Sequence, residues 1–367
     1  MIRVTAMNRK RFVGDWAMLG TVFGLILFGL LMIYSASNYT ARLHMGNAFY
    51  YVERQIFTVL LGTAAMFLMM KLDYHRLLKM ALPLYVLSLL LLAAVFVVGT
   101  ASHGQKRWIY IGSIGFQPSE FAKFVLIIFL ASICGAAGSM MKKWKGILLV
   151  FLWMMPVAGM VTNLSTGIII MGIAFIIIFT ASRQWLPFFV LMGLGGGFMG
   201  IFLKLASYRV GRIEAWLNVE THPKGYQTRQ SLYAIGSGGL FGRGYGKSIQ
   251  KLAYIPEAHN DMIFSVICEE WGLLGAGIIA ALFIFLIWRC LITANSAPDI
   301  PGALLTMGVT AHLGLQMLIN IAVVTNSIPN TGIPLPFISY GGTSLIFLMC
   351  EIGIVQNIAQ QGKTYIS

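Results

Sequence analysis

Asp261 is the residue of this sequence best placed to act as a general base. It ends a polar, basic stretch over residues 206–261 and stands directly before a long apolar run, in the segment PEAHNDMIF. A carboxylate at the start of a helix either caps the helix, whose dipole stabilises negative charge there, or accepts a proton from a hydroxyl group in a partly dehydrated cleft. Glu257 and His259 could assist it or contact a metal ion, but their spacing matches no specific metal motif.

Glu120 and Lys123 form a second candidate group, at positions i and i+3 of FQPSEFAKF. An ionised side chain at mid-membrane costs about 2.5–3.5 kcal/mol on insertion scales, so such residues usually face protein or water. Either the two side chains pair with each other, or they line a polar cavity in which Lys123 meets a substrate phosphate or orients Asp261.

The stretch 206–261 carries more positive charge than topology requires, because long loops are translocated largely regardless of charge. It is either a solvated face or an anion site for phosphate or pyrophosphate. Its cations are Arg209, Arg212, Lys224, Arg229, Arg243, Lys247 and Lys251. The glycines of GSGGLFGRGYG (236–246) allow positive φ and close approach to a ligand, so this segment is either a flexible turn or a ligand-cradling loop. It matches neither GxGxxG nor a Walker loop, and nucleotide binding is not indicated.

The composition is that of a polytopic membrane protein. Hydrophobic residues make up 58% of the chain, charged residues make up 10%, and the mean hydropathy is +0.79, so polar side chains are too few to cover a water-facing surface. The first apolar run, from Trp16 to about Ser35, lacks a small-residue cleavage site and is predicted to be a transmembrane helix. The four cysteines lie in or beside apolar runs, as expected of small buried hydrophobes. The net charge of +14 is dispersed between the runs, which does not favour nucleic-acid binding.

The apolar runs predict an all-α fold of about ten transmembrane helices, with a large extracytoplasmic loop (206–261) between the seventh and eighth. The predicted ranges are 14–36, 55–71, 78–99, 118–136, 146–162, 167–182, 185–205, 262–288, 302–325 and 338–360. The pair around 146–182 is expected to form a tight hairpin. The segment GIPLPFISYGGTS (332–344) is either a plain loop or a re-entrant segment beside the large loop, since broken backbone at membrane depth is tolerated where it lines a cavity.

Basic residues in the short loops predict the orientation of the chain. One side holds Arg3, Arg9, Lys10, Arg11, Lys71, Arg76, Lys79, Lys142, Lys143, Lys145, Arg183, Arg289 and Lys363. The opposite short loops hold only Arg42, Arg54, Lys106 and Arg107. Both termini are therefore predicted to be cytoplasmic, and the loop 206–261 to lie outside.

Nine segments, taken in order, resemble the SEDS family, which comprises the FtsW, RodA and SpoVE proteins of bacterial cell-wall synthesis. They are IYSAS (33–37), FYYVERQ (49–55), GQKRW (104–108), FQPSEFAK (116–123), YRVGRI (208–213), YQTRQSLYAIGSGGLFGRGYGKS (226–248), PEAHNDMIF (256–264), EEWGLLG (269–275) and IPLPFISYGG (333–342). The resemblance extends over nearly the whole chain. IYSAS and the aromatic residues before ERQ look closer to the FtsW and SpoVE branch.

The resemblance implies one SEDS-type membrane domain over residues 1–367. It implies a peptidoglycan glycosyltransferase that polymerises lipid II at the outer face of the cytoplasmic membrane, for cell division, cell shape or sporulation. The expected partners are a class B penicillin-binding protein and other membrane proteins of the divisome or elongasome. Asp261 matches the family's essential external aspartate, and Arg54, Glu120 and Lys123 match positions of its polar cavity.

Asn163 is a departure from the family pattern. Many members carry a PDLGT-type sequence where this chain has TNLST (162–166), so Asn163 takes the place of the aspartate. Asparagine forms hydrogen bonds but cannot serve as an anionic base or a strong metal ligand. Either this position is not the catalytic acid-base in this branch, or the activity of this chain is altered. We favour the first alternative and interpret Asn163 as a substrate-binding residue.

The reaction implied by the resemblance joins two lipid-linked disaccharides with inversion. Asp261 would deprotonate the acceptor's 4-hydroxyl, which attacks the donor's anomeric carbon. Negative charge on the leaving undecaprenyl pyrophosphate would be stabilised by cations, with Mg²⁺ or Mn²⁺ as a further candidate. The candidate cations are Lys123, Arg54, Arg209, Arg212 and Arg243.

Two other functional classes stay open. A lipid II flippase would need a polar route inward through several helices, whereas charge is expected only at the outer side of this bundle. A noncatalytic divisome or sporulation scaffold is the second, because Asn163 replaces the family aspartate.

Overall fold

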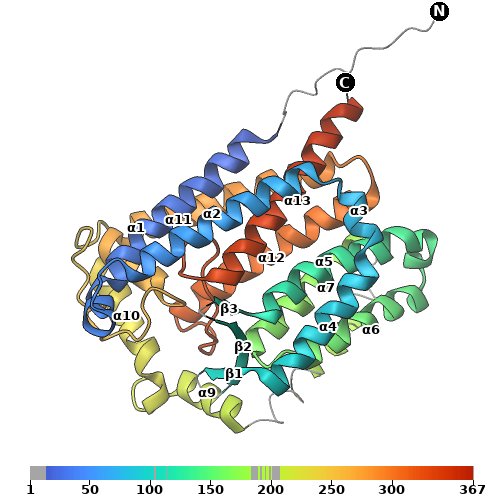
Figure 1. Cartoon of the computed structure of the whole chain (residues 1–367). Coiled ribbons are helices and arrows are strands. Elements are labelled where there is room, and N and C mark those ends of the chain that lie inside the picture. Colours follow the sequence, from blue (N-terminus) through green and yellow to red (C-terminus); the bar gives the residue numbers. More distant parts are fainter. Residues whose placement is uncertain are drawn as a thin grey trace, which may run out of the picture.

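The computed structural model describes residues 14–102, 105–112, 114–182 and 207–366, with short stretches between 189 and 200. These residues form a helical bundle in which α1 begins and α13 ends at the same end, while a small sheet lies toward the other end (Figure 1). The elements are α1 (Trp16–Met45), α2 (Tyr50–Lys71), α3 (Tyr74–Lys79), α4 (Ala81–Val98), β1 (Thr100–Ser102), β2 (Gln105–Ile111), β3 (Ile114–Phe116), α5 (Pro118–Ala137), η1 (Gly138–Lys142), α6 (Trp144–Met160), α7 (Leu164–Ser182), α9 (Ser207–Leu217), η2 (Pro223–Gly225), α10 (Tyr226–Gly238), α11 (Ile263–Asn295), α12 (Ile300–Val324) and α13 (Gly342–Ile366).

Among the described residues, eight helices are long and apolar enough to cross a membrane, and α6 is a shorter apolar helix. The eight are α1, α2, α4, α5, α7, α11, α12 and α13. The predicted helical, multi-pass architecture is therefore confirmed. The predicted seventh helix, 185–205, falls largely outside the described ranges.

Several helix boundaries differ from the prediction. The first helix extends to Met45 rather than to residue 36, because nothing stops it before Gly46, which ends it with a left-handed φ of 70°. The predicted helix 78–99 corresponds to α4, which begins at Ala81 because Met80 separates it from the short helix α3. The hairpin of α6 and α7 is confirmed, since only residues 161–163 separate the two helices.

The sheet is a second difference, since the prediction was all-α. Its three antiparallel strands run in the order β1-β2-β3, with Thr100 opposite Trp108 and Ile109 opposite Phe116. The segment QKRWIYI of β2 is rich in aromatic and β-branched residues, which favour strands. This segment is much shorter than the apolar runs from which the helices were predicted, yet it carries two residues of the site described below.

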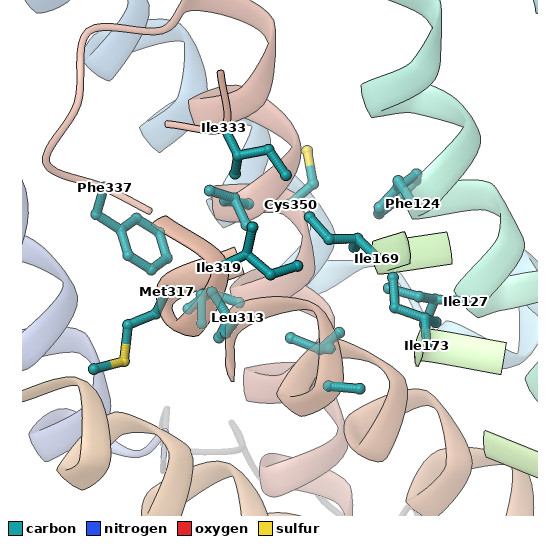
Figure 2. Close-up of a cluster of buried hydrophobic side chains, with 14 of the residues drawn as sticks. Phe124, Ile127, Ile169, Ile173, Leu313, Met317, Ile319, Ile333, Phe337 and Cys350 are labelled. Atoms are coloured by element: carbon teal, nitrogen blue, oxygen red, sulfur yellow. The ribbon is translucent and has the colours of Figure 1, made fainter. Parts of the chain in front are cut away.

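Helix α12 holds the bundle together by packing against α5, α7, α11 and α13. Figure 2 shows part of this contact, in which buried side chains from four helices and the segment before α13 meet. The labelled residues are Phe124, Ile127, Ile169, Ile173, Leu313, Met317, Ile319, Ile333, Phe337 and Cys350. In a bilayer such close packing stabilises the bundle through van der Waals contact rather than through removal of water.

Helix α11 contains a break at Gly272, which has φ 68° and ψ −167°. A side chain at this position would overlap the backbone of Leu240 and Gly242. The loop after α10 bonds to the backbone exposed by the break, with the amide of Gly244 2.9 Å from the carbonyl of Glu270. The glycines of 236–246 thus let this loop pack against α11.

Candidate active site

A polar cavity of about 730 Å³ lies at the end of the bundle that carries the sheet. Its walls come from the starts of α5 and α7, from β2, from α9 and α10, and from the segments that precede α11 and α13. The lining residues are Arg107, Trp108, Gln117, Glu120, Lys123, Asn163, Thr166, Arg212, Lys224, Gln227, Pro256, Glu257, Asn260, Asp261, Asn330, Gly332, Ile333, Pro334, Tyr340, Gly341, Gly342 and Ser344.

Asp261 lies in this cavity and is only partly buried. The N-cap position of α11 belongs to Met262 rather than to Asp261, which weighs against the simple capping role. The side-chain amide of Gln227 lies 3.5 Å from Oδ1 of Asp261. Asn320 donates to the main-chain carbonyl of Asp261 at 2.7 Å, so the residue is fixed on both its side-chain and backbone sides.

Glu120 and Lys123 pair with each other and also line the same cavity. Nζ of Lys123 is 2.9 Å from Oε1 of Glu120 and 3.4 Å from Oε1 of Gln316. Both residues are buried, at 5% and 2% exposed. The structure therefore places a buried ion pair and the carboxylate of Asp261 around one space.

Arg212 and Lys224 bring further positive charge to the cavity from the loop side. The guanidinium of Arg212 donates to the main-chain carbonyl of Asn330 at 3.1 Å, which ties α9 to the segment before α13. Lys224 lies beside α9, because a side chain added at Gly211 would be 3.2 Å from its Nζ. Two of the cations of the loop 206–261 therefore line the cavity.

The segment before α13 lines the cavity as irregular backbone. Residues 325–341 form no helix or strand, and Gly332, Ile333 and Pro334 contribute to the wall. The amide of Tyr340 donates to the carbonyl of His259 at 2.9 Å, so this segment lies beside the large loop. The segment therefore lines the cavity and lies beside the large loop.

Arg243 is not in the cavity, contrary to the prediction. Its guanidinium lies 3.7 Å from the carboxylate of Glu269, because the break in α11 draws this loop against that helix. The GSGGLFGRGYG segment is likewise absent from the cavity lining, so ligand cradling is not its role there.

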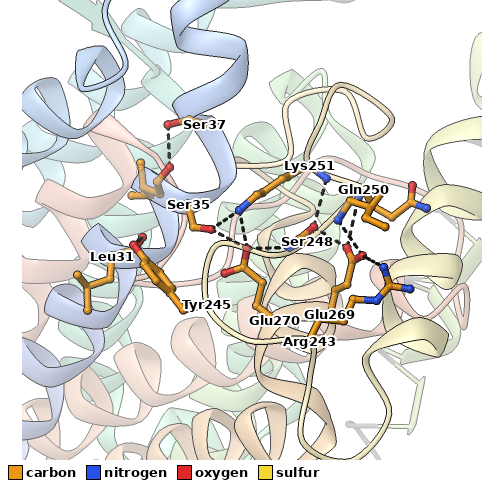
Figure 3. A network of polar contacts seen from close by, with 12 residues as sticks. Leu31, Ser35, Ser37, Arg243, Tyr245, Ser248, Gln250, Lys251, Glu269 and Glu270 are labelled. Atoms are coloured by element: carbon orange, nitrogen blue, oxygen red, sulfur yellow. Dashed lines mark hydrogen bonds and ion pairs between the residues drawn. The ribbon is translucent and has the colours of Figure 1, made fainter.

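Figure 3 shows the polar network that holds Arg243 in place. Lys251 is 2.8 Å from Glu270 and 2.8 Å from the hydroxyl of Ser35 in α1, and Ser248 donates to Glu269. Apart from the exposed Arg243, these residues are buried, and the network joins the loop to α1 and α11. Its charges are balanced within the protein, which indicates a structural role.

The relation of Arg54 to the cavity is indirect, and only the backbone of Arg209 is described. Arg54 lies over the ring of Tyr50, 4.6 Å from its centre, and hydrogen-bonds Tyr340, which lines the cavity. Arg54 itself is not among the lining residues. The backbone of Arg209 belongs to α9, but its side chain lies outside the described part of the structure.

Asn163 lines the cavity at the start of α7. Its Oδ1 accepts from the amide of Ser165 at 3.4 Å, and it is 5% exposed. Asn163 therefore both lines the cavity and satisfies a backbone donor of the helix.

His259 is not a cavity residue, although its neighbours in sequence are. Its ring packs 4.2 Å from the ring of Tyr51 and 5.5 Å from that of Tyr340. Burial lowers the pKa of His259 to about 4, so the imidazole is neutral at physiological pH. In the part of the chain that the structure describes, no three His, Cys, Asp or Glu side chains are grouped to hold a metal ion.

Several cavity residues were not identified from the sequence as site residues. Arg107 and Trp108 reach the cavity on β2, and Gln227, Asn330 and Tyr340 surround Asp261 or its neighbours. The sequence signals were the KRW and YQTRQ motifs, both noted only as parts of the resemblance.

The fold and the cavity define a multi-pass membrane protein in which a carboxylate and several cations meet at one end of a helical bundle. The chain belongs to the cell cycle protein family of FtsW, RodA and SpoVE, whose profile matches residues 15–364. It is 36% identical over 373 residues to the stage V sporulation protein E of Bacillus subtilis, covering 97% of this chain and all of that one. It is 36% identical over 361 residues to the probable peptidoglycan glycosyltransferase FtsW of a Geobacter species, covering 95% and 98% of the two chains.

Two solved structures are similar along almost the whole chain. One is described as structural coordination of polymerization and crosslinking by a peptidoglycan synthase complex; it has a TM-score of 0.81 and 27% identity, over 96% of this chain and 99% of that one. The other, the rod shape determining protein RodA of Thermus thermophilus, has a TM-score of 0.72 and 28% identity, over 95% and 97%. The family resemblance in the sequence is therefore confirmed.

Proposed function

We propose that this protein is a peptidoglycan glycosyltransferase that polymerises lipid II at the outer face of the cytoplasmic membrane. The observation that carries the proposal is that Asp261 and Lys123 line one cavity. A carboxylate beside a cation suits a reaction in which a hydroxyl loses a proton while a pyrophosphate leaves. The names of the relatives support the same activity.

Asp261 is the proposed general base. It takes the proton from the 4-hydroxyl of the acceptor sugar as that oxygen attacks the anomeric carbon of the donor. The glycosidic bond forms, the bond to undecaprenyl pyrophosphate breaks, and the configuration inverts without a covalent enzyme intermediate. Both substrates are anchored in the membrane, which confines and orients them for the attack.

The cations on two sides of the cavity are proposed to hold the pyrophosphate groups. Lys123 and Arg107 lie on the side of α5 and β2, and Arg212 and Lys224 on the side of α9. Positive charge preorganised in a site of restricted solvent access stabilises the charge of the leaving group without further rearrangement. Arg54 acts indirectly, through Tyr340.

Mg²⁺ or Mn²⁺ fits this cavity as a proposed cofactor. Asp261 and Glu257 supply carboxylates, and Asn260 and Asn330 supply amide groups. Mg²⁺ is often bound by one or two carboxylates together with substrate phosphates rather than by an all-protein cage. The ion would contribute positive charge to the leaving pyrophosphate.

The proposed setting is the cytoplasmic membrane of a bacterium, with both termini in the cytoplasm and the cavity outside. The basic short loops support that orientation, and the start of α1 and the end of α13 share one end of the bundle. A class B penicillin-binding protein is the proposed partner, since a similar structure belongs to a synthase complex for polymerization and crosslinking.

The test is polymerisation of purified lipid II by the full chain in nanodiscs, with and without the class B penicillin-binding protein. Wild-type protein is expected to form glycan strands, and Asp261→Asn is expected to be slower by about 100-fold or more, as for loss of a general base. Glu214→Gln, an exposed carboxylate on α9, is the matched control and should retain full activity. Equal activity of Asp261→Asn would refute the assignment of the base.

Lipid transport is the competing function, because buried charges also lie deeper in the bundle, as described in the next section. If neither condition yields polymer while labelled lipid II crosses the membrane of proteoliposomes, the protein is a flippase. If neither activity occurs, a noncatalytic scaffold role is favoured.

A further inference from the structure

A second pair of ionisable residues lies in the middle of the bundle. His312 of α12 and Glu351 of α13 are 2.9 Å apart, and both side chains are fully enclosed, at 0% and 1% exposed. His312 lies midway along α12, about 18 Å from either end at a rise of 1.5 Å per residue. The expectation that charge occurs only at the outer side of the bundle was therefore wrong.

This pair is connected to the cavity along one face of α12. His312, Gln316 and Asn320 follow one another at intervals of four residues, which places them on the same helix face. Gln316 accepts from Lys123 and donates to the carbonyl of Pro334 at 3.1 Å. Helix α12, which contacts Asp261 through Asn320 and Lys123 through Gln316, thus also carries His312 nearer the middle of the bundle.

His312 is oriented by one ring nitrogen and has the other available. Nδ1 contacts both carboxylate oxygens of Glu351 at 2.9 Å. Nε2 is buried and has no hydrogen-bond partner among the described residues. Its imidazole is also close enough to Glu120 for its charge to act on that carboxylate.

We propose that His312 and Glu351 are positioning residues that set the charge of the cavity floor. Protonated His312, held by Glu351, lies behind Glu120 and offsets its negative charge. The positive charge of Lys123 is then less neutralised and attracts a pyrophosphate more strongly. Loss of the imidazole proton leaves one more negative charge beneath the cavity and weakens that attraction.

Few ionisable residues surround His312, so few could produce this effect. Glu120 and Lys123 face it from α5, and Glu351 from α13. Helix α11 contributes the buried thiol of Cys290, which interacts with Glu351. Helix α7 has no titratable residue in its sequence.

The inference rests on the proposed function, because it assumes a ligand with a pyrophosphate group. The experiment measures the dissociation constant of undecaprenyl pyrophosphate for the full chain in nanodiscs between pH 5.5 and 8.5. The variant is His312→Gln/Glu351→Gln, which keeps polar groups at both positions but removes both charges. Cys350→Ala, a change in an uncharged buried neighbour of Glu351, is the control.

The ratio of the wild-type to the variant dissociation constant is expected to rise about fivefold across this pH range, the order of effect for one unit charge roughly 17 Å away at an effective dielectric constant of about 20. Titration of the ligand itself cancels in this ratio. The control should show the wild-type pH dependence. A purely structural pair would alter stability but leave the ratio constant, and a constant ratio overturns the proposal.

A second variant guards against misfolding of the first. His312→Leu/Glu351→Met replaces the pair with apolar side chains, a change that buried ion pairs often tolerate, and it should give the same change in the ratio. If wild-type protein forms no polymer but the ratio still changes, the proposed function fails and this inference stands. If wild-type protein does not bind undecaprenyl pyrophosphate at any pH, this inference fails.

Discussion

The side-chain amide of Asn320 lies 2.7 Å from the main-chain carbonyl of Asp261. The same nitrogen is 2.7 Å from the carbonyl of Ile333, so one buried side chain joins the proposed base to the irregular segment beside it. Neither segment has a regular backbone ladder at this point. Asn320 therefore takes the place of secondary structure in fixing the site.

Replacement of Asn320 by leucine is predicted to impair the site more than the fold. The change leaves two buried carbonyl groups without a donor, at a cost of about 1–3 kcal/mol each if they stay unsatisfied. At temperatures at which the variant is still folded, we expect the rate of polymerisation to fall by at least tenfold, because Asp261 loses its fixed position. Lipid II polymerisation and thermal unfolding measure the two effects, and Asn218→Leu, at an exposed position of the loop, should change neither.

Two glycines near the end of α10 are predicted to respond in opposite ways to alanine. A side chain at Gly238 would overlap the carbonyl of Cys268 in α11, whereas Gly236 has open space within 4 Å. Gly238→Ala is expected to lower the unfolding temperature in detergent. Gly236→Ala should leave it unchanged or raise it, since alanine is favoured over glycine in a helix by about 0.5–1 kcal/mol. Equal behaviour of the two variants would contradict the packing of α10 on α11.

The buried pair of Lys251 and Glu270 is predicted to be necessary for stability. Lys251→Met leaves the carboxylate of Glu270 buried without its counter-ion, a type of change that costs about 3–5 kcal/mol. Denaturant or thermal unfolding of the purified chain measures this loss. Lys247→Met, which removes an exposed cation of the same loop, should stay within about 0.5 kcal/mol of wild type. Adding Glu270→Gln to Lys251→Met should recover part of the loss.

His75 is predicted to make stability depend on pH at the other end of the bundle. It lies 2.8 Å from Asp73 and 2.8 Å from Asp299. Partial burial acts to lower the pKa of His75, but the hydrogen bonds to both aspartates outweigh it and raise the pKa above its ordinary value. Its stabilising contribution is thus fully present below about pH 6.5, the ordinary value, and is lost as pH rises through the raised value.

The measurement is the unfolding temperature of wild type and His75→Gln between pH 5.5 and 9. The difference between the two proteins should be largest at the acidic end and should shrink toward the alkaline end. The effect is expected to be modest, because the side chain of His75 is 44% exposed and solvent screens its ion pairs. A difference that grows with pH would contradict this account.

The sequence predicted those parts of the site that stand next to long apolar runs. Asp261, Glu120 and Lys123 were recognisable because an ionised residue beside a membrane helix requires a reason. The prediction placed Arg243 in the cavity wrongly, because the path of the loop depends on the break at Gly272. The spacing of apolar residues along the sequence does not reveal this break. His312 and Glu351 stand 39 positions apart in two separate apolar runs, and only the packing of α12 against α13 brings them together.

The break at Gly272 also bears on how the protein responds to the thickness of its membrane. Residues 273–295 of α11 span about 34 Å as a helix, enough to cross a hydrocarbon core of about 30 Å. Helices adapt to thicker or thinner bilayers chiefly by tilting, and the interrupted backbone prevents rigid transmission of that tilt to residues 263–271. The outer segment is instead held by the loop and by α1 through Glu269 and Glu270. We therefore expect Asp261 to keep its position relative to the cavity when the thickness of the bilayer changes.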